Sequence, residues 1–132
     1  SVIDLDTVMP GLVAFDFGDA IRAGANTAAE DERDLSNVAL DIDKFEAFTR
    51  GFLGVDKDAL TEAEIDSLAG GALAMTVECG VRFLTDYLDG DKYFSVDYET
   101  HNLVRARCQL ALAKDMIAHF DEMKEIVKKY AE

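Results

Sequence analysis

The chain has 132 residues, of which 27 are acidic and 13 basic, and its formal net charge at neutral pH is −14. Its length suits one domain, and 49% apolar residues can form a core. So negative a chain, with no local basic patch, repels phosphate backbones and is not expected to bind nucleic acid. No apolar run of membrane-spanning length and no signal-type segment is present, so we expect no membrane partner and a cytoplasmic location.

The two cysteines, Cys79 and Cys108, both lie in apolar, helix-like stretches. Neither has a CxxC spacing or a neighbouring histidine, so we expect buried, reduced thiols and no zinc site.

The first dozen residues carry a different pattern from the rest of the chain. Residues 2–6, VIDLD, alternate apolar and acidic side chains, which predicts the end of a strand whose partner lies outside this chain. Residues 9–11, MPG, indicate a turn. A short helix with Phe15, Phe17 and Ile21 on its apolar side is then predicted to end at Gly24.

After a charged loop at residues 27–37, the remaining pattern is helical. Asp41 is predicted to cap a helix whose phenylalanines Phe45, Phe48 and Phe52 belong to the core. A capping box at residues 61–64 opens a long helix that ends near Asp89, with a kink or break at the glycine pair 70–71. A last helix is predicted over residues 100–130. The fold class is therefore all-α, a helical subdomain with a short N-terminal strand remnant.

Asp4 and Asp6 are candidate metal ligands. Carboxylates two residues apart on an extended segment point to the same side, and such a pair can bind Mg²⁺ together with substrate phosphates. The alternative is that both aspartates cap the adjacent turn.

Several runs in order resemble a known family. VIDLDT, MPG and FDFGDAIR, within residues 2–22, are similar to the metal-binding segment of aminoglycoside-phosphotransferase-like kinases, whose fold is two-lobed and protein-kinase-like. GANTAAED at 24–31, ECGVRFLTDYL at 78–88, GDKYF at 90–94 and HNL at 101–103 resemble N-acetylhexosamine 1-kinases in particular. Together these segments cover most of residues 2–110.

The resemblance implies a C-terminal fragment of an ATP-dependent sugar kinase. Residues 1–132 would be the C-terminal helical part of its phosphotransferase domain, with the ATP lobe and the catalytic loop upstream. No catalytic residue is then expected in this chain, and the fragment alone is expected to be inactive. Asp4 would hold Mg²⁺ on the ATP phosphates, with Asp6 as a second-shell or occasional ligand. The acceptor would be the anomeric hydroxyl of an N-acetylhexosamine; nothing in the residues themselves fixes which hydroxyl is used.

Four residues are candidates for the sugar site. Arg82 could bind sugar oxygens or developing phosphate charge, or it could simply pair with Glu78 one helical turn away. Tyr93 could contact the sugar or pack within its loop. Asp19 and Arg22 could shape the site or form a local ion pair.

The rival interpretation is a non-enzymatic helical module that binds a partner protein through apolar faces at residues 42–53 and 103–127. A fragment cut from a kinase would also expose an apolar face, and we expect homodimers through such faces.

Overall fold

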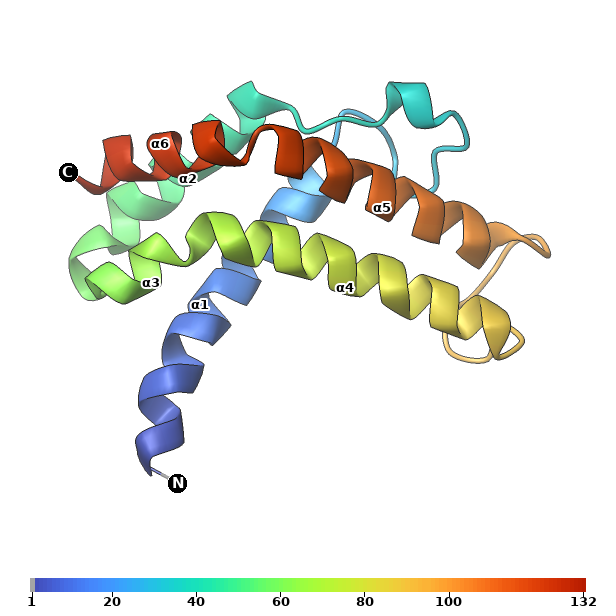
Figure 1. Cartoon of the computed structure of the whole chain (residues 1–132), viewed down its shortest axis with the longest axis horizontal. Coiled ribbons are helices and arrows are strands. Elements are labelled where there is room, and N and C mark those ends of the chain that lie inside the picture. The colour runs from blue at the N-terminus through green and yellow to red at the C-terminus, as the bar shows by residue number, and fades with distance from the viewer. Residues whose placement is uncertain (1) are drawn as a thin grey trace.

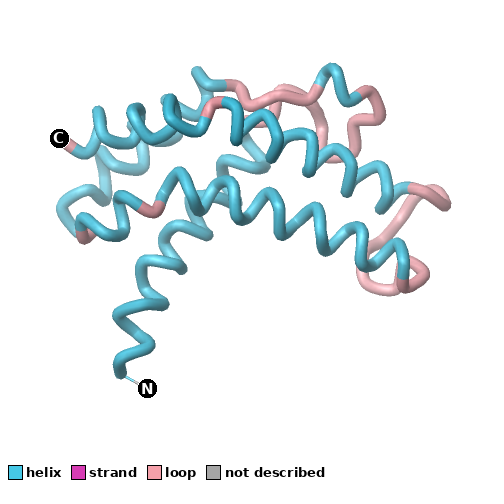
Figure 2. The backbone as a smooth tube through the Cα atoms, in the orientation of Figure 1, coloured by secondary structure: helices cyan, strands magenta, loops and turns pink. Residues whose placement is uncertain are grey.

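The computed structural model describes the backbone of residues 2–132 and the side chains of residues 13–55 and 57–132. It contains the α-helices α1 (Val2–Gly24), α2 (Ile42–Asp56), α3 (Glu62–Asp66), α4 (Leu68–Leu88), α5 (His101–Ala118) and α6 (Phe120–Ala131). Two 3-10 turns, η1 (Leu35–Asn37) and η2 (Lys57–Ala59), join them. Over residues 2–132 there is no strand, only an isolated bridge between Asn26 and Leu40. The all-α prediction is confirmed (Figures 1 and 2).

The predicted strand remnant is wrong in this structure. Residues 2–6 and the predicted turn at 9–11 belong to α1, which continues to Gly24. A lone strand leaves its backbone N–H and C=O groups without partners, whereas a helix pairs them within the segment. With no strand beside it in the described chain, the segment takes the conformation that satisfies its own backbone.

The residues predicted to cap the helices do so in the structure. Each of the two long helices predicted for residues 61–89 and 100–130, however, is divided into two. Asp41 caps α2 by accepting a hydrogen bond from the Lys44 N–H, and the capping box at Thr61 opens α3. The chain then breaks at Ser67, just before the glycine pair, and again at His119. Each break turns a single predicted helix into two shorter ones, so that α3 and α6 can contact each other.

The core is built around α4, which contacts both α1 and α5 extensively. Figure 1 shows α4 and α5 side by side, with α1 crossing behind α4. α4 is long and apolar enough to cross a membrane, with a mean hydropathy of 1.2 over its most apolar window, but a core helix in this position meets the same test. Phe45 is fully buried, while Phe48 is exposed and is not the core residue that was predicted.

The crossing of α1 and α4 depends on two glycines. A Cβ atom on Gly18 would lie against the backbone carbonyl of Gly71, and a Cβ atom on Gly71 would lie against Ala14. Each contact would be far inside van der Waals distance, and each would press on backbone that cannot rotate away. Gly70, the neighbour in sequence, faces open space. The two helices therefore touch along their backbones at this point.

We predict that Gly71→Ala destabilises the chain by about 1–3 kcal/mol or more, because the added methyl group overpacks the crossing. Gly70→Ala is the matched control and should stabilise the chain by up to about 1 kcal/mol, since it only improves helix propensity. Urea unfolding followed by circular dichroism measures both. Equal effects of the two substitutions would contradict this description of the crossing.

Candidate functional site

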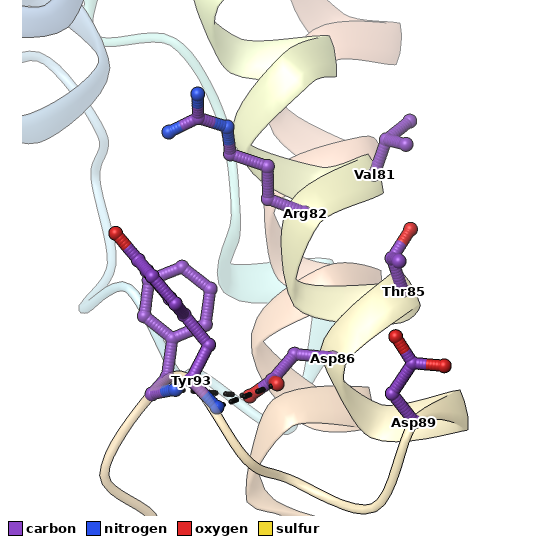
Figure 3. Close-up of a pocket in the computed structure, with 7 residues that line it drawn as sticks. Val81, Arg82, Thr85, Asp86, Asp89 and Tyr93 are labelled. Atoms are coloured by element: carbon purple, nitrogen blue, oxygen red, sulfur yellow. Dashed lines mark hydrogen bonds between the residues drawn. The ribbon is translucent and has the colours of Figure 1, made fainter.

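A pocket of about 390 Å³ lies where α4 ends and the loop of residues 89–100 begins. It is lined by Val81, Arg82, Thr85, Asp86, Asp89, Tyr93 and Phe94 (Figure 3). The lining combines aromatic rings with a guanidinium, two carboxylates and a hydroxyl. That mixture of flat apolar surface and polar groups suits a small polar ligand that carries many hydroxyls.

The Asp86 carboxylate fixes the loop on one side of this pocket. Its Oδ1 accepts the backbone N–H of Tyr93 at 2.8 Å, and its Oδ2 accepts the N–H of Phe94 at 3.0 Å. Asn102 of α5 donates from Nδ2 to the same Oδ2 at 2.8 Å. Backbone hydrogen bonds, that of Phe94 first, hold the pKa of Asp86 below its ordinary value. The carboxylate is therefore an ionised anchor at neutral pH.

The chain reverses sharply before it reaches Tyr93. Gly90 has φ +93° and Asp91 has φ +61°, both in the left-handed region that follows a helix end. This turn directs residues 93 and 94 back along α4, where Asp86 binds their amides.

Phe94 separates this pocket from a second one of about 320 Å³. The second pocket is lined by Arg22, Glu30, Cys79, Phe83, Phe94, Ser95 and Arg105. Within it the rings of Phe83 and Phe94 pack at 4.7 Å between centroids. Burial raises the pKa of the Cys79 thiol, so the cysteine stays protonated and is a poor nucleophile.

The predicted sugar-site residues lie around two neighbouring pockets, both of which Phe94 lines. Arg82 and Tyr93 line the first pocket, and Figure 3 shows their side chains on the same side of α4. Arg22 lines the adjoining pocket, where it donates to Glu30 at 2.8 Å and to Asp19 at 3.1 Å. Asp19 is exposed and reaches this region only through Arg22.

The local ion pairs that were weighed as alternatives are present as well. Arg82 lies 3.3 Å from Glu78 one turn before it, and both side chains are largely exposed. An exposed pair of this kind contributes at most about 1 kcal/mol, so it leaves Arg82 available to a ligand.

Sequence reasoning missed Asp86, Phe94 and Asn102, which build the pocket. It also missed the link between buried His101 and Asp31, in which Nε2 lies 3.0 Å from Oδ2. His101 Nδ1 accepts the Asp97 N–H at 3.1 Å and so holds the far end of the same loop. One feature of the sequence could have indicated Asp86. It is an acidic residue on a largely apolar helix, four residues before the turn at Gly90 and Asp91, and such a carboxylate needs hydrogen-bond donors nearby.

The two candidate metal ligands stay a prediction. Asp4 and Asp6 lie in α1, and their side chains are outside the described ones. Among the side chains that are described, no group of three His, Cys, Asp or Glu residues could hold a metal ion.

A comparison with protein-family models found no match to this chain.

We predict that the loop keeps its anchor well below neutral pH. A carboxylate with a lowered folded-state pKa stabilises the structure above its unfolded pKa of about 3.9, and this contribution is lost only as pH falls through the lower folded value. In an NMR pH titration, the Phe94 amide should shift with a midpoint below about 3.9. Asp86→Asn should abolish the shift. A midpoint at or above the ordinary value would contradict the anchor.

Proposed function

We propose that this chain is the C-terminal, acceptor-binding part of an ATP-dependent phosphotransferase that acts on a sugar hydroxyl. The family resemblance favours the anomeric hydroxyl of an N-acetylhexosamine. One observation carries the proposal: Arg82 and Tyr93, two of the four candidate sugar residues, come from a helix and a separate loop and line the same pocket.

The chemistry of the lining agrees with a sugar. Tyr93 is 80% exposed and offers both a ring face and a hydroxyl, while Phe94 adds a second aromatic surface. Arg82 supplies fixed N–H donors, and Asp89 and Thr85 supply acceptors for hydroxyl groups. A sugar ring presents the complementary set, with apolar C–H faces and hydroxyls around its edge.

The phosphoryl-transfer half of the reaction is assigned to the parent enzyme. ATP, Mg²⁺ and a general base would act there, with Asp4 as the metal ligand that the resemblance implies. This chain's own contribution is to bind and orient the acceptor, which in phosphoryl transfer is a large part of catalysis.

The first test is ATP consumption by the full-length enzyme against a panel of sugars, aminoglycosides and amino alcohols, with phosphorus NMR of the products. Turnover confined to N-acetylhexosamines, with a sugar 1-phosphate as product, supports the proposal in full. Phosphorylation of a different hydroxyl compound would keep the kinase and replace the substrate. Absence of ATP use would contradict the proposal.

We predict that Arg82→Ala in the full-length enzyme lowers kcat/KM for the sugar by about 10- to 100-fold, the effect of losing a hydrogen bond from a charged group. Glu78→Gln is the control, because it removes the partner of Arg82 and leaves the guanidinium in place. It should change kcat/KM less than about threefold. Similar small effects of both variants would mean that Arg82 only forms a surface ion pair with Glu78 and does not bind the sugar.

A second candidate function is the helical interaction module. It draws on exposed apolar side chains within the two predicted faces, Phe48 on α2 and Leu110 and Ile117 on α5. A kinase fragment, by contrast, should self-associate through the face that its other lobe covers, and light scattering should then show a mass that rises with concentration and with salt, since salt screens the net charge of −14. A monomer under all conditions that binds neither sugar nor nucleotide would leave only a heterologous partner.

A further inference from the structure

The exposed ring of Tyr93 owes its position to its backbone. The side chain is 80% exposed, and its recorded aromatic contact is an edge-on one with Phe94, at 4.9 Å between centroids. Its N–H and that of Phe94 are both bound by the Asp86 carboxylate, which is 6% exposed. A buried group on a rigid helix thus holds the backbone from which the exposed ring projects (Figure 3).

The anchor continues across to α5 through Asn102, which is fully buried. Its Nδ2 donates to Asp86 and, at 3.1 Å, to Asp91 in the turn. Its Oδ1 accepts from Arg105, whose guanidinium also donates to the Ser95 carbonyl at 2.9 Å. The loop is therefore bound on both sides of Tyr93, by a network in which the negative Asp86, the neutral Asn102 and the positive Arg105 follow one another.

The oxygens of Asp86 are occupied by these donors. A neutral side chain of the same shape would not replace it, because an asparagine carries one acceptor oxygen and would turn its own N–H₂ group toward an N–H donor. Moving the amides of residues 93 and 94 would move both aromatic groups of the pocket at once.

We propose that Asp86 is the positioning residue of the acceptor site, and that it acts by holding Tyr93 and not by contact with the reacting atoms. This inference rests on the proposed function. In this proposal a buried carboxylate controls how the sugar is bound. That carboxylate was not among the four candidate sugar residues of the sequence analysis.

The test is the kinetics of Asp86→Asn in the full-length enzyme. The KM for the sugar should rise by about 10- to 100-fold, while kcat and the KM for ATP change less than about threefold, because the loop that binds the sugar has lost its charged anchor. Glu99→Gln is the matched control: it removes a negative charge from the same loop, where Glu99 is exposed. Its kinetic constants should equal those of the wild type.

A double-mutant cycle separates positioning from general destabilisation. If Asp86 acts through Tyr93, Asp86→Asn should add less than about twofold to the effect of Tyr93→Ala. Effects that multiply, or a fall in kcat with unchanged KM, would overturn the inference.

If Asp86→Asn fails to fold, Asp86→Glu keeps the charge and displaces the anchor by one methylene. It should raise the sugar KM less than the loss of the tyrosine does, and unchanged kinetics would overturn the inference.

The two proposals fail in different ways. A wild-type enzyme that phosphorylates a sugar, with an Asp86→Asn variant of equal KM, would remove Asp86 from the site and leave the function standing. A wild-type enzyme that uses no sugar would overturn both.

Discussion

The backbone contact between Gly18 and Gly71 is the constraint on which the packing of α1 against α4, and with it the second pocket, depends. It sets α1 directly against α4, with no side chain between the two glycine positions. One turn beyond Gly18 on α1, Arg22 then reaches the pocket that Cys79, two turns beyond Gly71 on α4, also lines. A larger residue at either glycine would move α1 outward and withdraw Arg22 from this region. The small residues of the core thus determine which charged residues can meet at the surface.

Local rules predicted the features that local chemistry decides. The cap at Asp41, the box at Thr61 and the end of α1 at Gly24 each depend on residues within one turn of the helix terminus. The breaks at Ser67 and His119 were not predicted at those residues, because neither interrupts the apolar periodicity; the kink or break that was predicted lies at the glycine pair 70–71, just after Ser67. They place α3 against α6 and α6 against α2, contacts between segments far apart in sequence that no local pattern encodes.

For the candidate site too, some residues could be predicted from the sequence and others could not. Arg82 and Tyr93 were selected because runs around them resemble a kinase family, and the fold places both at one pocket. Asp86 gave no comparable signal, since a single aspartate in a helix is common. Its role emerges only when the turn at Gly90 returns two backbone amides to it and α5 supplies Asn102. An acidic residue on an apolar helix indicates that donors lie nearby, but the pattern of side-chain types does not identify backbone donors.

The metal hypothesis shows how a spacing acquires meaning only from its conformation. Two aspartates at a spacing of two share a side on a strand, with its period of two, and lie apart on a helix, with its period of 3.6. In this structure residues 2–6 belong to α1, so the extended segment on which the metal hypothesis was based is absent, while the side chains of Asp4 and Asp6 lie outside the described ones. Under the kinase proposal, the metal role of Asp4 is therefore a separate prediction from acceptor binding, which is proposed for a pocket lined by α4 and the loop after it and braced by Asn102 of α5.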